Sequence, residues 1–154
     1  MSGLPLRIRN FQDEDLERLY EIDRICFSDE IAYSRAELLF QVNHPKSITR
    51  VGEGPGTILG FVLARIEHPS CAHVLTLDVI PEARRCRIGI SLMRFLHGLL
   101  AKEHVTVAVL EVSVRNLPAI RLYEKLRYKH VETLYGYYRG GEDAYRMVRV
   151  AGSL

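Results

Sequence analysis

The segment Leu77–Met93 reads LDVIPEARRCRIGISLM and contains a strand-like run, a basic turn and the start of an apolar helical stripe. The first N–H groups of a helix lack intrahelical partners, and the positive end of the helix dipole lies there. Because Arg84, Arg85 and Arg87 precede this helix directly, the turn suits a phosphate or pyrophosphate group. The alternative interpretation is a solvated basic turn before a surface helix.

The two commoner phosphate-binding motifs are missing from the sequence. Neither GxxxxGK followed by Ser or Thr nor GxGxxG occurs, which removes the main support for an ATPase, a GTPase or a Rossmann-type dehydrogenase.

Composition predicts an ordinary globular protein. The chain has 154 residues, of which 47% are hydrophobic and 26% charged, so we expect one domain, residues 1–154, with its own core. With 21 basic and 19 acidic residues the net charge is +2, and we expect no nucleic-acid partner.

Cysteine usage and the start of the chain favour a reducing compartment. The chain has three cysteines, an odd number, and no CxxC pair, which predicts free thiols at Cys26, Cys71 and Cys86. The six histidines show no metal-ligand spacing, so we interpret them as surface or core residues and expect no metal. The segment Met1–Asn10 has no apolar core of a secretory signal, and no apolar run approaches the ~20 residues of a membrane span. We therefore expect a cytoplasmic protein without a membrane partner.

Hydrophobic periodicity predicts the element order βααβββαβαββ. Ser34 and Glu37 form a capping-box pattern, Asp13–Asp15 supplies an N-cap and an acidic first turn, and Gly52–Gly56 reads as a hairpin turn. The apolar run Val105–Val114 predicts a central strand. Strands are expected near residues 6–8, 47–51, 58–66, 73–80, 105–114, 128–138 and 144–150, and helices near 13–27, 34–42, 88–102 and 116–126. The fold class is α/β, more closely an α+β mixed sheet, and not a regular doubly wound fold.

The segment Leu77–Met93 resembles the pyrophosphate-binding motif of the GNAT acetyltransferase superfamily. In this motif Arg or Gln is followed by any two residues, then Gly, any one residue, and Gly or Ala. A second segment, LEVSVRNLPAIRLYEKLRY at 110–128, is similar to the family's LEV…N…AI.LYEKLGF. The stretches 6–9, 13–27, 136–138 and 142–147 resemble the subgroup that acetylates protein N-termini, typified by ribosomal-protein alanine acetyltransferase. The resemblance covers essentially the whole chain and implies the GNAT fold.

The resemblance implies acetyl-CoA as co-substrate, bound between the strand that ends at Val79 and the strand through Glu111. Main-chain groups of Leu77–Val79 would pair with the pantetheine, the Val79 N–H would polarise the thioester oxygen, and the turn before the helix would cradle the pyrophosphate. Asn116 caps its own helix and would also contact CoA. The implied cofactor-binding residues are Leu77, Asp78, Val79, Arg84, Arg85, Cys86, Arg87, Ile88, Gly89, Ile90 and Asn116.

Two positions depart from the family pattern. Arg87 replaces the first motif glycine, and Arg127–Tyr128 replaces the family's Gly-Phe. Arginine would cost roughly 1–2 kcal/mol at Arg87 if φ were positive there. We expect instead a near-helical Arg87 with its side chain turned out of the cradle.

Two residues carry the chemistry that the resemblance implies. Glu111 is the candidate general base, because burial in an apolar strand is expected to raise its pKa. The alternatives are a solvated edge position or a peptide anchor. Tyr123 is the candidate general acid for the CoA thiolate, although its spacing also fits a core tyrosine.

The expected reaction is acetyl transfer to a protein N-terminal α-amine, with Tyr33, Tyr137 and Tyr138 lining a peptide groove. These tyrosines also fit ordinary strand positions. The alternatives are a small-molecule amine acetyltransferase and a non-catalytic acyl-CoA-binding domain. The protein partner is the substrate N-terminus, and the chain is expected to be a monomer or a weak homodimer.

Overall fold

The computed structural model describes residues 5–152. The element order matches the expected one, with two short 3₁₀ turns added. The strands are β1 Arg7–Asn10, β2 Ser47–Gly54, β3 Thr57–His68, β4 Cys71–Val79, β5 Val107–Ser113, β6 Lys129–Leu134 and β7 Ala144–Val150. The helices are α1 Leu16–Cys26, α2 Arg35–Asn43, α3 Ile88–Lys102 and α4 Leu117–Lys125, with 3₁₀ turns η1 Asp13–Asp15 and η2 Pro81–Ala83.

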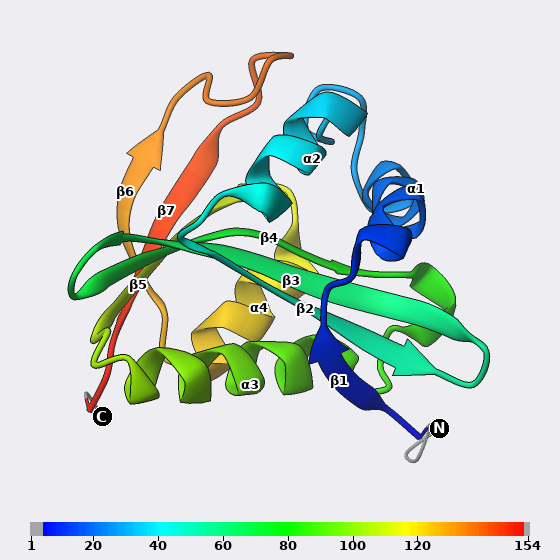
Figure 1. Ribbon diagram of the computed structural model, residues 1–154. Coiled ribbons are helices and arrows are strands. Elements are labelled where there is room, and N and C mark those ends of the chain that lie inside the picture. Colours follow the sequence, from blue (N-terminus) through cyan, green and yellow to red (C-terminus); the bar gives the residue numbers. More distant parts are fainter. Residues whose placement is uncertain (1–4, 153–154) are drawn as a thin grey trace.

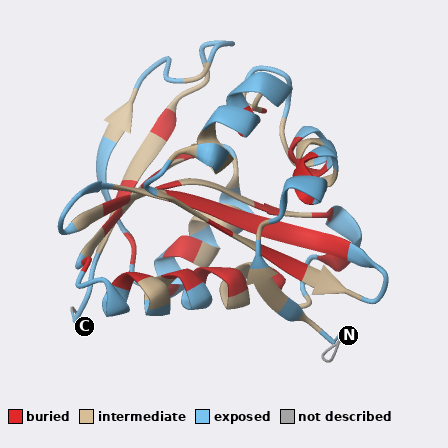
Figure 2. Cartoon of the chain, in the orientation of Figure 1, coloured by how far each residue is buried: buried red, intermediate tan, exposed pale blue. Residues whose placement is uncertain are grey.

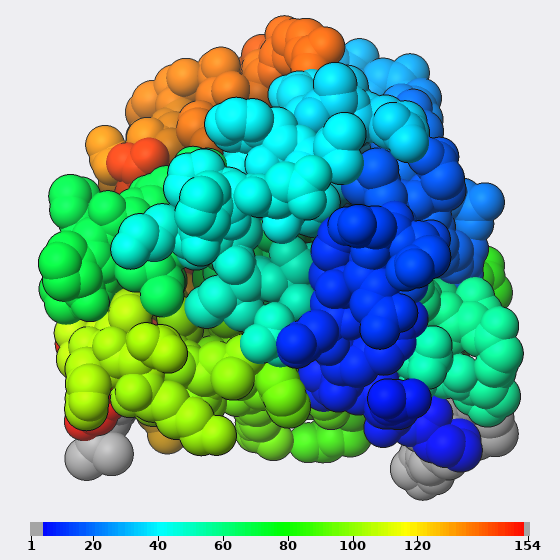
Figure 3. All heavy atoms as spheres, viewed as in Figure 1, coloured from blue at the N-terminus to red at the C-terminus, as the bar shows by residue number. Residues whose placement is uncertain are grey.

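Within residues 5–152, seven strands form one sheet in the order β1-β2-β3-β4-β5-β7-β6. Among these described strands β4 and β5 pair in parallel, and all other neighbours are antiparallel. Helices α1 and α2 cover one face of the sheet, while α3 and α4 cover the other (Figure 1). The space-filling view shows α1 and α2 in blue and cyan above the sheet and α3 below it (Figure 3). The predicted mixed sheet is therefore confirmed.

The core lies where helices cover the sheet on both faces. In β3, every residue from Ile58 to Ala64 is buried, because α1 and α3 both pack on this strand. Along α3 the buried residues Leu92, Leu96 and Leu100 recur at helical spacing, while Phe95 is exposed. The buried residues, in red, follow β3 and the inner side of α3 (Figure 2).

Local capping signals in the sequence are mostly confirmed. The Glu37 N–H donates to Ser34 Oγ at 3.1 Å, and the Ser34 N–H donates to Glu37 Oε1 at 3.1 Å. The Asn116 side chain caps α4 by accepting from the Ala119 N–H at 3.3 Å. The acidic run differs from the prediction: it forms the 3₁₀ turn η1, and the Asp15 carboxylate binds Arg9 at 2.8 Å.

The last hairpin also differs from the prediction. The sixth strand was expected over residues 128–138 but spans only Lys129–Leu134. Gly136 and Gly141 adopt positive φ values of 62° and 89°, which extended strands do not accommodate. Tyr137 and Tyr138 therefore lie in the loop of residues 135–143, not on a strand.

The expected free thiols are confirmed, since all three cysteines are unpaired. Within residues 5–152, no helix combines the length and apolar character needed to cross a membrane.

Candidate active site

The site begins where two parallel strands separate. Pairing of β4 with β5 extends from Cys71 opposite Val107 to Val74 opposite Leu110. Beyond that point β4 continues to Val79 while pairing with β3 on its other edge. Within residues 5–152, the β4 edge that faces β5 over 75–79 has no strand partner. Such an edge offers main-chain groups to an extended ligand.

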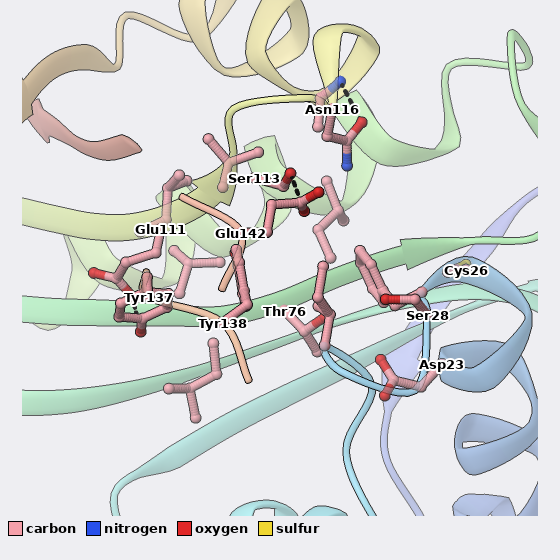
Figure 4. A pocket seen from close by; sticks show the side chains of 18 of the residues that line it. Asp23, Cys26, Ser28, Thr76, Glu111, Ser113, Asn116, Tyr137, Tyr138 and Glu142 are labelled. Atoms are coloured by element: carbon pink, nitrogen blue, oxygen red, sulfur yellow. Dashed lines mark hydrogen bonds between the residues drawn. The ribbon is translucent and has the colours of Figure 1, made fainter. Parts of the chain in front are cut away.

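A cavity of about 350 Å³ fills the space between the separated strands. Its walls come from the end of α1 and the following loop, β4, β5, the start of α4 and the loop 135–143 (Figure 4). The cavity brings together both predicted catalytic residues, all three predicted substrate residues and two of the predicted cofactor residues. These are Glu111, Tyr123, Tyr33, Tyr137, Tyr138, Leu77 and Asn116.

The remaining predicted cofactor residues follow along the chain outside the cavity lining. Asp78 and Val79 end β4, and Arg84–Ile90 form the turn and first residues of α3. The Arg84 side chain folds back to donate from Nε to the Val79 carbonyl at 3.1 Å. The Asp78 side chain is fully buried and lies outside the cavity lining, so it is not available to a ligand in the cleft.

Glu111 lies at the centre of a charged cluster on the cavity wall. Its carboxylate contacts His73 Nε2 at 2.6 Å and accepts from Arg146 Nε at 3.1 Å and from the Tyr137 hydroxyl at 3.3 Å. Burial to 7% side-chain exposure would raise the pKa of Glu111, but the hydrogen bonds and charges of His73 and Arg146 outweigh burial. The pKa of Glu111 is consequently below its ordinary value, and the expectation of a raised pKa is wrong.

His73 is the functional candidate that the sequence interpretation missed. Its sequence context predicts a surface or core histidine, yet it lines the cavity beside Glu111. Burial lowers the pKa of His73. Hydrogen bonds and charges from Glu111 and Glu67 raise it by a larger amount, so the pKa of His73 lies above its ordinary value. His73 and Glu111 are 38 positions apart, so only the parallel alignment of β4 and β5 reveals the pair.

Tyr123 is buried on the inner side of α4, at 7% exposure. Its ring meets that of Tyr128 edge-on, with centroids 5.8 Å apart. The pKa of Tyr123 is raised above its ordinary value, mainly by burial and to a smaller extent by the nearby Tyr128 and Asp78. The hydroxyl therefore stays protonated at neutral pH, and burial makes it a weaker acid than a tyrosine in water.

The backbone at Arg87 contradicts the expected near-helical conformation. Arg87 is the N-cap residue of α3 with φ 63° and ψ 19°, in the left-handed region. Its side chain is exposed, as expected. Arg127 also has a positive φ of 74°. Both family glycines that this chain replaces thus occupy left-handed positions, which glycine adopts without the steric cost that arginine incurs.

Two further carboxylates lie buried between α1 and β4. Asp78 accepts from Thr76 Oγ1 at 2.5 Å, and Asp23 accepts from the Tyr33 N–H at 2.7 Å. The other oxygen of each, Asp78 Oδ2 and Asp23 Oδ1, is buried without a hydrogen-bond donor. A proton on Asp78 would satisfy both oxygens by a hydrogen bond to Asp23. Burial, and then Asp23, raise the pKa of Asp78 well above its ordinary value, in agreement with this arrangement.

The separated strands and the cavity that holds both Glu111 and Tyr123 are suited to acyl transfer. The family model for the Acetyltransferase (GNAT) family matches residues 16–128, and the chain belongs to this family.

Its relatives include N-terminal acetyltransferases. The N-alpha-acetyltransferase of Sulfurisphaera tokodaii is 33% identical over 161 residues, covering 95% of this chain and 93% of the relative. The crystal structure of Ard1 from Thermoplasma volcanium superposes with a TM-score of 0.87 at 28% identity, covering 96% and 99% of the two chains. The ribosomal-protein alanine N-acetyltransferase of Escherichia coli has the same fold, with a TM-score of 0.87 at 23% identity over 97% and 96% of the chains.

The left-handed backbone at Arg87 predicts that Arg87→Gly is more stable than Arg87→Ala by about 1 kcal/mol. Both variants remove the charge, so their difference isolates the backbone cost. Urea unfolding without ligand measures it. The matched pair at the end of α4 is Arg127→Gly and Arg127→Ala. The glycine variant should again be the more stable of the two, by a similar amount. Equal stability within the Arg87 pair would contradict a positive φ.

Because Asp78 is buried, we predict that Asp78→Asn stabilises the protein by an amount that depends on pH. The folded state keeps Asp78 protonated, whereas the unfolded chain releases this proton above about pH 4. The contribution of Asp78 to the stability of the wild-type protein therefore falls as pH rises from about 4 toward the raised pKa of Asp78. Asparagine is neutral throughout, so the variant should be more stable than wild type at pH 8, and this difference should shrink toward pH 4. Unfolding measured across this range would refute the prediction if the difference were constant.

Proposed function

We propose that the chain is one catalytic domain, residues 1–154, that transfers the acetyl group of acetyl-CoA to the α-amine of a protein N-terminus. The single observation that carries the proposal is the convergence of Glu111 with His73, Tyr123 and the unpaired β4 edge on one cavity. The curated relatives with N-alpha-acetyltransferase activity in their names support the choice of acceptor. The free thiols support a cytoplasmic location, and we infer a monomer or a weak homodimer.

The residues present fit acetyl-CoA. The unpaired edge over 75–79 suits an extended pantetheine arm, and the start of α3 supplies N–H groups and three exposed arginines to the phosphates. When bound, acetyl-CoA supplies the thioester. Leu77–Val79 would hold it by main-chain hydrogen bonds, with the Val79 N–H directed at the thioester oxygen. Asn116 would add a polar contact from the cap of α4.

Glu111 and His73 would act together as the base. An α-amine has a pKa near 8, so the substrate reaches the cavity largely as an ammonium ion at neutral pH. The lowered pKa of Glu111 makes its carboxylate a weak base alone. The imidazole beside it, with a raised pKa, makes the pair a stronger proton acceptor. The freed amine then attacks the thioester carbon.

Tyr123, which lines the same cavity from α4, would complete the transfer. As the new C–N bond forms, the C–S bond breaks and the leaving thiolate takes the Tyr123 hydroxyl proton. The second proton of the attacking nitrogen, released as the amide forms, would restore the Tyr123 hydroxyl. Tyr33, Tyr137 and Tyr138 would line the groove for the first residues of the acceptor, because all three reach the cavity from loops. This arrangement leaves the acetylated N-terminus and free CoA as products.

A panel of short peptides with different first residues, incubated with acetyl-CoA and read by mass spectrometry, tests the proposal. We expect +42 Da on the α-amine, a mass that follows from replacing one hydrogen with an acetyl group. Matched peptides with blocked N-termini, and a set of free amines and amino acids, are the controls. Acetylation of free amines alone would favour a small-molecule enzyme, and no product from any acceptor would favour a CoA-binding domain without catalysis.

Tyr123→Phe should lower kcat by about 10²–10⁴-fold while leaving acetyl-CoA binding nearly unchanged, because only the acid is lost. Tyr128→Phe is the matched control. It also removes one buried tyrosine hydroxyl, but that hydroxyl pairs with His97 at 2.8 Å, away from the cavity lining. Turnover assays and calorimetric titration with acetyl-CoA measure the two effects. If both variants retained wild-type turnover, Tyr123 would be a packing residue.

A further inference from the structure

The loop of residues 135–143 carries two of the proposed substrate residues. Tyr137 and Tyr138 both line the cavity, and their rings meet edge-on with centroids 5.0 Å apart. A loop lacks the hydrogen-bond ladder that fixes a strand within a sheet. The positions of these two rings therefore depend on the contacts that anchor the loop to the rest of the protein.

Glu142, at the C-terminal end of the loop, is tied to the end of β5. Its Oε2 accepts from the Ser113 hydroxyl at 2.5 Å, a contact drawn in Figure 4, and its Oε1 lies 3.5 Å from Arg115 Nε. The Ser113 hydroxyl oxygen also accepts from the Arg115 N–H at 3.2 Å. Because Ser113 is buried at the end of the strand that carries Glu111, this contact joins the loop to a rigid part of the sheet.

Asp143, the next residue, joins the end of the loop to its beginning. Its Oδ1 accepts from the Gly136 N–H at 2.8 Å, and its carbonyl accepts from the Val114 N–H at 3.1 Å. Inside the loop, the Tyr138 N–H donates to the Glu142 carbonyl at 3.0 Å. These contacts fix the loop backbone at its first residues, at Tyr138 and at its last residues.

The loop also contacts the segment 27–34 between α1 and α2, which forms another part of the cavity wall. A Cβ atom at Gly140 would lie 2.9 Å from Glu30 Cγ, so glycine permits the close approach of the two segments. Tyr33, the third proposed substrate residue, lies on the segment 27–34. Displacement of the loop would therefore move its two tyrosines relative to Tyr33 and change the shape of the proposed groove.

We propose that Glu142 and Asp143 are positioning residues that hold Tyr137 and Tyr138 in place to bind the first residues of the acceptor peptide. The two carboxylates act through the loop and transfer no proton in the reaction. This inference rests on the proposed function, since it takes a peptide N-terminus as the acceptor. The competing role for Glu142 is a direct ionic contact with the substrate ammonium, because Glu142 also lines the cavity.

Glu142→Ala tests the proposal by steady-state kinetics. Loss of the hydrogen bond from Ser113 should raise KM for a peptide acceptor by about tenfold, an ordinary effect for one hydrogen bond to a charged group. The value of kcat should fall by no more than about threefold, because Glu111, His73 and Tyr123 lie on the sheet and α4 and not on the loop. The affinity for acetyl-CoA, measured by calorimetric titration, should equal that of wild type.

Glu142→Gln distinguishes the positioning role from a direct ionic contact. Glutamine keeps an oxygen that accepts from Ser113, and the lost ion pair with the exposed Arg115 contributes little, so KM should return to within about threefold of wild type. Glu142→Gln as impaired as Glu142→Ala would overturn the positioning role and favour the ionic contact. Ser113→Ala should raise KM as Glu142→Ala does, and the double variant should add little, because both changes remove one bond.

Limited digestion of the full chain with trypsin measures the loop directly, because Arg139 is exposed within it. Glu142→Ala and Asp143→Ala should each speed cleavage after Arg139 by about tenfold, since both release the loop. Cleavage at the exposed arginines of residues 84–87 is the internal reference, and mass spectrometry separates the fragments. An equal rise at both places would indicate loss of stability throughout the fold and would overturn the proposal.

Glu17→Ala is the matched control. It removes a carboxylate from an exposed pair with Arg35, away from the cavity lining, and should change neither KM nor cleavage at Arg139. The two hypotheses fail separately. If wild type acetylated no peptide, the proposed function would fail, and digestion would still decide whether the two carboxylates hold the loop. Unchanged cleavage and KM in Glu142→Ala and Asp143→Ala would overturn the positioning role and leave the proposed function intact.

Discussion

The short parallel pairing between β4 and β5 positions both the cleft and the N-terminus of α3. Parallel neighbours need a crossover connection, and α3 supplies it. The crossover places the N-terminus of α3 directly after the end of β4, beside the unpaired edge of 75–79. Because pairing stops at Val74 and Leu110, the strands separate and the cavity opens between them. The arginine turn and the cleft therefore share one geometric origin.

Neighbouring charge, rather than the burial that both share, shifts the pKa values of Glu111 and Asp78 in opposite directions. Glu111 and Asp78 are both removed from solvent. Glu111 has His73 and Arg146 beside it, so it stays ionised. Asp78 has another carboxylate, Asp23, beside it, so its neutral form is favoured. One carboxylate is thereby suited to proton transfer, and the other to packing α1 against β4.

Two of the arginines at left-handed positions, Arg87 and Arg127, show how the fold tolerates departures from its family pattern. Arg87 and Arg127 keep the backbone path of the turns before α3 and after α4, at a steric cost that packing of both helices offsets. Arg87 adds positive charge at a helix start, where a phosphate would bind. Replacement of the motif glycine by Arg87 therefore removes conformational freedom from the turn but keeps its positive charge for a phosphate.

The sequence alone determined the element order, because hydrophobic periodicity and the caps at Ser34 and Asn116 depend on residues within one turn of each other. Motif resemblance identified Glu111 and Tyr123 for the same reason, since each lies in a continuous segment. The partners of Glu111 depend on tertiary contacts, because His73 and Arg146 are 38 and 35 positions away and meet it on neighbouring strands. Those partners set its pKa, so the protonation of the site depends on contacts that no local pattern encodes.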